Sequence, residues 1–260
     1  MPFRSPALVV VWTSLAFCQA TSGPKKPLEI LSDTSWVSCW GERGGEFGSR
    51  LARSKPLLSP DRRYRAFADV VAKATHTSPG QAGRETQDCE NVSRLLVGER
   101  GNEARGVFEQ KPSGNLKGNT LVIVDWSRDS RFLLAQLSQW VYESHGWSNE
   151  VVLYDTQEKK VIHLDLNEVF GKSLGKDCAA YGEVLGFSED SQIVFKAHPA
   201  ADEIDAELNG PFCVKREGLW LVHPQTRKIQ RLSPSFKVKK NGLVRLGAGH
   251  TGATGRNTPN

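Results

Sequence analysis

One short phrase occurs three times in this chain, each time between two apolar runs. It consists of an apolar residue, Ser, any residue and Asp, then two polar residues and a new apolar residue, and the copies span 58–64, 126–132 and 187–193. This pattern is typical of a strand that ends in a tight turn from which the next strand starts. Its recurrence roughly every 60 residues predicts a protein built from repeated β units.

Strand signals around these corners come in sets of four, because β-branched and aromatic runs alternate with turn formers. The second repeat predicts strands over 120–126, 131–137, 150–154 and 160–164. The third repeat predicts strands over 183–187, 192–197, 218–223 and 227–232. The first repeat predicts strands over 64–71, 94–98 and 106–110, with an initial strand near 51–58 that Pro56 interrupts.

These repeats resemble the blades of TolB-type or WD-repeat-like β-propellers. In that family an apolar residue precedes Ser-Pro-Asp-Gly-Lys and a strand, and a later strand ends in Asp, a turn and a basic residue. The three corners match the first half and residues 154–160 match the second, while the turn glycine is replaced by Arg62, Ser130 and Ser191. The resemblance covers about residues 50–235 and implies an all-β, propeller-like array of four-stranded antiparallel blades.

The blade count determines whether such an array closes into a ring. Closed propellers typically have four to eight blades, and three are clear here, at about 49–111, 119–165 and 182–233. We expect a repeat domain over 49–246, with residues 28–48 and 237–246 contributing strands to a further blade. An open partial propeller and a small β-sandwich of similar hairpins are the alternatives. Residues 247–260 are expected to form a flexible tail.

Residues 1–20 are predicted to be a cleavable export signal. Arg4 precedes the apolar run 7–17, and Cys18-Gln19-Ala20 supplies the small residues at a cleavage site. The run is too short to cross a bilayer, and no second run of membrane length follows, so no transmembrane segment is expected. The predicted location is secreted or periplasmic, with a lipoprotein acylated at Cys18 as the alternative.

The charge balance argues against a nucleic-acid partner. Without Arg4, 33 of the 34 basic residues remain against 29 acidic ones, a net charge of +4. The basic residues form no patch interleaved with aromatic side chains, as nucleic-acid binding would favour. One local cluster, Lys237, Lys239, Lys240 and Arg245, is explained by a solvated strand edge.

Four cysteines remain after the predicted signal, and an even number in an exported protein favours two disulfides with three possible connectivities. In an up-and-down blade the first and third strands start on the same side of the sheet. Cys178 and Cys213 precede those strands in the third repeat, and Cys39 and Cys89 do so in the first. We therefore predict the pairs Cys39–Cys89 and Cys178–Cys213. Free thiols are the alternative, and no zinc spacing is present.

The connections between the second and third strands of each repeat are predicted to be long, at 72–91, 138–149 and 198–217. Long loops on one side of a rigid scaffold commonly carry binding sites. The middle connection supplies the candidate surface for a protein or small polar ligand, formed by Trp140, Tyr142, Glu143, His145 and Trp147. The alternative is that Trp140 and Tyr142 extend the strand and pack on a neighbouring sheet.

No catalytic motif with a known mechanism is present, so the sequence assigns no catalytic residue, metal or cofactor. The repeated Asp61, Asp129 and Asp190 are interpreted as turn formers. The leading hypothesis is an exported, non-catalytic, propeller-like binding or scaffold protein. The alternatives are a structural envelope protein and a secreted, glycosidase-like hydrolase using the loop carboxylates Glu143, Asp202 and Asp205. A glycosylation sequon begins at Asn91.

Overall fold

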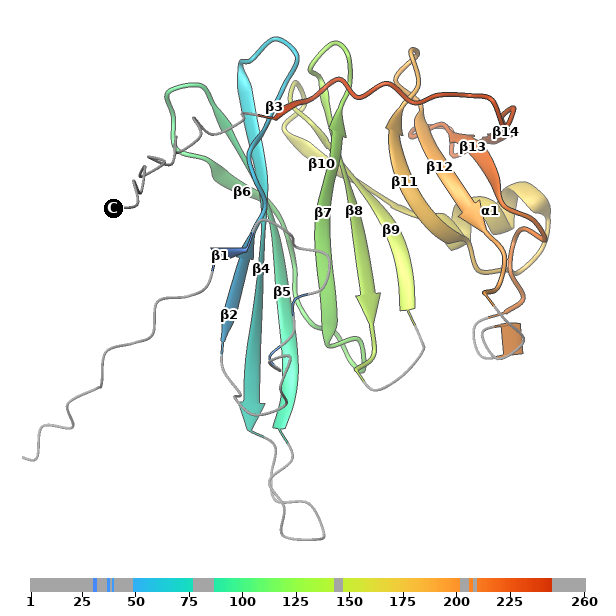
Figure 1. The fold of residues 1–260 in the computed structure, drawn as a ribbon, viewed down its shortest axis with the longest axis horizontal. Coiled ribbons are helices and arrows are strands. Elements are labelled where there is room, and N and C mark those ends of the chain that lie inside the picture. Colours follow the sequence, from blue (N-terminus) through green and yellow to red (C-terminus); the bar gives the residue numbers. More distant parts are fainter. Residues whose placement is uncertain are drawn as a thin grey trace, which may run out of the picture.

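The computed structural model describes residues 30–31, 37, 39, 49–76, 87–142, 147–201, 206–207 and 210–244. These residues form an all-β protein with a nine-residue helix. The strands lie in three sheets that stand side by side (Figure 1). Pairing within the sheets is antiparallel except between β1 and β2.

The first sheet contains both terminal strands of the described chain. β2 (Arg50–Arg53) and β3 (Leu57–Leu58) pair in turn with β4 (Tyr64–His76), which is followed by β5 (Gln87–Glu99) and β6 (Arg105–Gln110). Pro56 separates β2 from β3, as predicted, because proline has no N–H for the ladder. β1 (Ile30–Leu31) is added beside β2, and β15 (Leu243–Val244) beside β3.

The other two sheets are four-stranded meanders in sequence order. The second contains β7 (Gly118–Trp126), β8 (Phe132–Trp140), β9 (Trp147–Asp155) and β10 (Lys160–Asp165). The third contains β11 (Tyr181–Phe187), β12 (Ile193–His198), β13 (Gly218–Val222) and β14 (Ile229–Arg231). The prediction of antiparallel four-stranded units is therefore confirmed for the second and third repeats, whereas the strands of the first repeat belong to a seven-stranded sheet. The expected further blade is wrong for the terminal strands that are described, because β1 and β15 join the first sheet, and the described sheets do not close into a ring.

The three corners that carry the repeated phrase have the same local structure. In each, the residue after Asp donates its N–H to the carbonyl of the corner Ser, at 2.8, 2.9 and 3.1 Å. That residue has a positive φ in every copy, 60° at Arg62, 64° at Ser130 and 57° at Ser191. These are the positions where the resembled family has glycine, the residue best suited to left-handed backbone.

The second sheet is buried on both faces, which explains its nearly continuous apolar strands. Side chains alternate between the two faces of a strand. Along β8, Leu133 and Ala135 pack toward the first sheet, while Phe132 and Leu134 pack toward the third. The first sheet contributes small side chains such as Ala66 to this interface, which lets it approach closely.

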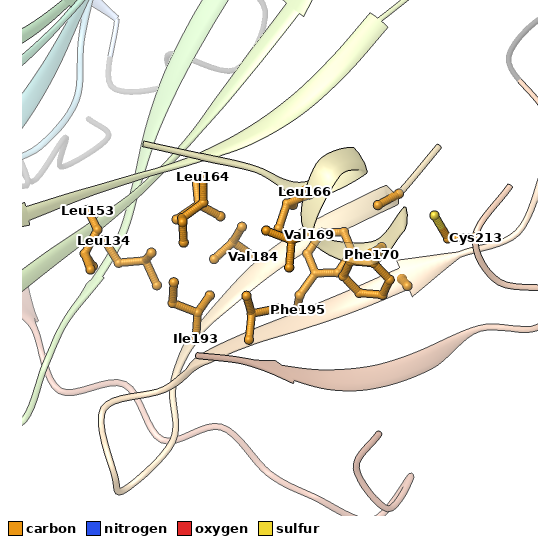
Figure 2. Close-up of a cluster of buried hydrophobic side chains, with 14 of the residues drawn as sticks. Leu134, Leu153, Leu164, Leu166, Val169, Phe170, Val184, Ile193, Phe195 and Cys213 are labelled. Atoms are coloured by element: carbon orange, nitrogen blue, oxygen red, sulfur yellow. The ribbon is translucent and has the colours of Figure 1, made fainter. Parts of the chain in front are cut away.

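Helix α1 (Leu166–Leu174) joins the second sheet to the third and fills the space between them. The Asp165 carboxylate caps its start by accepting from the N–H groups of Asn167 and Glu168, and Gly175 ends it with a left-handed φ of 66°. The buried Phe170 meets the ring of Phe195 edge to face (Figure 2). It meets the ring of Trp220 in the same way. The sequence analysis did not predict this helix.

Two disulfides are present, Cys39–Cys89 and Cys178–Cys213, which are the predicted pairs. Such bonds are typical of proteins that fold in an oxidising compartment. The predicted export signal, residues 1–20, lies outside the described residues. Within the described residues, the structure contains no helix with the length and apolar character needed to cross a membrane.

Residues 233–244, which we call the C-terminal strap, return from the third sheet to the first. Figure 1 shows this red segment passing the ends of β11 and β7 before it reaches β3. The Lys240 ammonium donates to the carbonyls of Val124 in β7 and Leu185 in β11, at 3.0 and 2.6 Å. The strap therefore connects all three sheets.

Candidate functional site

The aromatic residues predicted to form a binding loop lie largely on strands. Trp140 is the last residue of β8, and it pairs with Trp147 at the start of β9. The hairpin of the first sheet is extended in the same way, since β4 continues to His76 and β5 begins at Gln87. The predicted limits of these two connections, 138–149 and 72–91, are therefore wrong, because the strands run further than their most apolar parts.

Tyr142 connects the second sheet to the first through a buried amide. Its hydroxyl donates to Asn91 Oδ1 at 2.7 Å, and Asn91 Nδ2 donates to the carbonyls of Val37 and Asn119, both at 2.9 Å. Burial raises the pKa of Tyr142. The Trp140 ring meets the Tyr142 ring edge-on at 5.9 Å, and Tyr142 itself packs against buried side chains of the first sheet.

The same contacts determine whether Asn91, which begins the glycosylation sequon, can carry a glycan in the folded protein. Asn91 is completely buried, and both hydrogens of its amide point toward protein carbonyls. The neighbouring Ser93 hydroxyl donates to Asn119 Oδ1 at 2.6 Å. A glycan on Asn91 would displace these bonds, so the folded state has no place for one.

The other predicted site residues fall outside the described residues. Glu143 and His145 lie in the undescribed connection, the Trp147 side chain is not described, and Asp202 and Asp205 lie in another undescribed segment. Their suggested roles stay predictions. Where side chains are described, no group of three or more His, Cys, Asp or Glu is arranged to hold a metal ion.

A cavity of about 620 Å³ lies at the opposite end of the first sheet, and we call it the arginine pocket. The turn between β3 and β4, the turn between β5 and β6, and β15 enclose it. Its lining consists of Leu58, Arg62, Tyr64, Arg65, Arg100, Gly101, Leu243 and Val244. Pockets that hold small ligands usually have volumes of this order.

Backbone contacts fix the two turns that carry the arginines. The Arg100 N–H donates to the Arg63 carbonyl at 2.7 Å, which ties the second turn to the first. The Arg65 guanidinium donates to the Asn102 carbonyl at 2.9 Å across the same gap. Arg62 leaves its turn from a left-handed residue with φ of 60°. The three guanidinium groups are therefore presented from a rigid frame.

The apolar part of the pocket is supported from the second sheet and by the strap. The Tyr64 ring stacks on Trp126 of β7, with centroids 6.0 Å apart and planes 23° apart. Trp126 in turn donates its indole N–H to the Leu57 carbonyl at 3.2 Å. Leu243 and Val244 are 38% and 54% exposed, and they are two of the three large apolar side chains exposed among the described residues.

The charges in this pocket are unbalanced. Among the described residues, no carboxylate lies within ion-pair distance of Arg62, Arg65 or Arg100. Four of the other described arginines are paired, Arg53 with Asp69 at 2.6 Å, Arg94 with Glu109 at 2.5 Å, Arg131 with Asp155 at 2.7 Å and Arg227 with Glu168 at 3.1 Å. Guanidinium groups stay charged at physiological pH and match the planar or tetrahedral oxygens of carboxylates and phosphates.

A second cavity, of about 380 Å³, lies beside the strap on the third sheet. Its lining includes Arg128, Lys237 and Lys239 but also Glu189 and Asp190, so positive and negative side chains offset one another. In the part of its lining that the structure describes, the arginine pocket has charged side chains of one sign only. It is therefore the stronger candidate for a site that recognises a charged ligand.

Comparison with known proteins gives no matching family model and no significant match among curated proteins. The sequence analysis missed the arginine pocket because three distant segments, 58–65, 100–101 and 243–244, build it. One signal was visible, namely an arginine at Arg62 where the resembled family has a turn glycine. The return of the strap to the first sheet left no signal in the local sequence.

Proposed function

We propose that this chain is an exported, non-catalytic binding protein with a propeller-like repeat architecture, and that its ligand site is the arginine pocket. The observation that carries the proposal is the gathering, beside apolar side chains in one cavity, of three guanidinium groups that form no ion pair with a described carboxylate. Arg62, Arg65 and Arg100 are exposed, and guanidinium donors that no protein carboxylate occupies can bind an anion, which satisfies both charge and hydrogen-bond donors.

Binding without catalysis agrees with the chemistry of the lining. Acid–base and nucleophilic catalysis need a side chain such as His, Asp, Glu, Cys or Ser within reach of the substrate. Among the described residues, none of these types lines the pocket, and the one hydroxyl of its described lining belongs to Tyr64, whose ring is stacked on Trp126. The groups present can bind and orient an anion.

Export is supported by two independent features of the chain. Both disulfides join the predicted cysteine pairs, and such bonds form in oxidising compartments. The predicted cleavable signal over 1–20 directs a chain to such a compartment. A secreted or periplasmic ligand-binding protein combines these features with the pocket.

The test is calorimetric binding of phenyl phosphate and benzoate to the oxidised mature protein. We expect Arg62→Gln, Arg65→Gln and Arg100→Gln each to weaken binding by about 10-fold or more, because a charge-assisted hydrogen bond is worth about 1.5–3 kcal/mol. Arg63→Gln is the matched control, since Arg63 lies on the same turn over the Tyr64 ring but does not line the pocket. The Arg63→Gln substitution should change the dissociation constant by less than about threefold.

Two results would count against the proposal. One is the absence of binding for both anions at low ionic strength, where charge interactions are strongest. The other is an equal loss in all four variants, which would indicate a general field of positive charge rather than a site built by three arginines.

A further inference from the structure

We infer that the ligand is an amphiphilic anion with a single linear apolar chain, and that Asp125 is the positioning residue behind this specificity. The inference rests on the proposed function of the arginine pocket and adds the ligand class to it. The arginines would hold the anionic head, and Leu243 and Val244 of the strap would form a wall for the chain.

The wall exists only because the strap returns to the first sheet. Leu243 pairs with Leu58 and Val244 with Leu57, in a ladder of two residues. So short a ladder is weak by itself, since isolated pairs of strands are marginal in water. Another contact must therefore hold the strap at this position.

Asp125 of β7 supplies that contact just before the wall begins. One of its carboxylate oxygens accepts from the N–H groups of Gly242 and Trp126, both at 2.8 Å, and the Asn241 N–H adds a bond at 3.1 Å. Asp125 is only 1% exposed. The β7–β8 register shifts between Ile123 and Asp125, and irregularities of this kind redirect side chains.

Further contacts leave the strap little freedom around Asp125. The Lys240 ammonium is held by two carbonyls, and Asn241 Nδ2 donates to the Trp126 carbonyl at 3.1 Å. A Cβ atom on Gly242 would lie 2.8 Å from the Leu57 side chain, so the strap packs directly against that side chain of β3. The wall is thus fixed from β7 and β11, outside the pocket.

The head and chain subsites depend on different parts of the molecule. The three arginines belong to the β3–β4 turn, β4 and the β5–β6 turn, which are tied together by their own bonds. None of them contacts Asp125 or Lys240 in the bonds described above. A change at Asp125 should therefore move the wall and leave the arginines in place.

A homologous series of alkyl phosphates tests the head subsite and the chain subsite separately. Dissociation constants would be measured for inorganic phosphate and for methyl, butyl and octyl phosphate, below their micelle-forming concentrations. In the native protein each methylene buried against the wall should tighten binding about fourfold until the wall is covered. In Asp125→Asn, which keeps one acceptor oxygen for the strap N–H groups but loses the negative charge and the second acceptor, that gain should fall. Its affinity for inorganic phosphate should change less than about twofold.

A second variant keeps the test decisive if Asp125→Asn fails to fold. Lys240→Gln should reduce the gain per methylene, whereas Lys239→Gln, its neighbour on the strap, should keep the native gain. Binding to anionic phospholipid vesicles would be measured as well. Binding to vesicles without binding of free octyl phosphate would overturn the inference.

The outcomes also distinguish this inference from the proposed function. Arginine-dependent phosphate binding with no gain along the series would refute the amphiphile and leave an anion-binding protein. A native gain along the series that neither Asp125→Asn nor Lys240→Gln alters would refute the role of Asp125. Absence of any arginine-dependent phosphate binding would remove the proposed function itself.

Discussion

Buried carboxylates in this protein are surrounded by donors that belong to the turns. Asp155 is 2% exposed, and burial alone would raise its pKa. The Arg131 guanidinium and the N–H groups of Gln157 and Glu158 outweigh burial, so the pKa of Asp155 lies below its ordinary value. The carboxylate therefore stays charged and holds the β9–β10 turn closed.

His163 on β10 gives a pH dependence with a definite sign. Its hydrogen bond to Glu150 raises the pKa of His163, although partial burial opposes this. A raised pKa in the folded state means that the ion pair stabilises the fold below the unfolded value of about 6.5 and loses this effect as the pH rises through the folded value.

We predict that the native protein exceeds His163→Gln in free energy of unfolding at pH 5.5 and not at pH 8.5. The difference should stay below about 1 kcal/mol, because His163 is 43% exposed and solvent screens the pair. Urea unfolding at both values measures it. A difference of equal size at both pH values, or one that survives in a Glu150→Gln background, would contradict the assignment.

At the level of elements, the turn between the third and fourth strands is held by different side chains in the second and third repeats. The Asp155 carboxylate accepts two backbone N–H groups in one hairpin, and His223 Nδ1 accepts the equivalent pair in the other. Lys159 and Arg227 occupy equivalent positions in these turns, with φ of 51° and 56°. Positive φ strains any residue with a Cβ.

Glycine at these two positions should therefore stabilise the protein. We predict that Lys159→Gly raises the free energy of unfolding by about 0.5–1 kcal/mol, since relief of strain exceeds the added entropy of the unfolded chain. Arg227→Gly should raise it by less, because it also removes the ion pair of Arg227 with Glu168 at 3.1 Å. Thermal and urea unfolding provide the measurement. Lys160→Gly, one residue further inside β10, should lower stability instead, and a gain there would indicate that the turn geometry is not the cause.

Elements were predictable from the sequence to the extent that they repeat. The corner phrase located every turn that starts a second strand, and the apolar runs located the strands, because burial on both faces leaves little choice of residue type. Helix α1 was missed although Asp165, Glu168 and Gly175 carry its capping signals. Nine residues following directly on a strand were too short for the helical periodicity to stand out.

At the scale of the whole molecule, the repeated sheets could be predicted from the sequence. The way in which the terminal strands join them could not. The last described strand adds to the first sheet through contacts between residues more than 150 positions apart, as between Leu58 and Leu243. No local pattern carries such information. The pocket depends on that same return, so the candidate site was beyond prediction even though each of its turns was expected.

The central claim is that the arginine pocket binds an anion with an apolar chain. Its most direct test is a crystal structure of the oxidised protein with 8-bromooctyl phosphate, in which anomalous scattering locates the bromine. We predict phosphate density between Arg62, Arg65 and Arg100, and bromine beside Leu243 and Val244. Ligand bound elsewhere, or an empty pocket at a concentration that saturates binding in solution, would contradict the account.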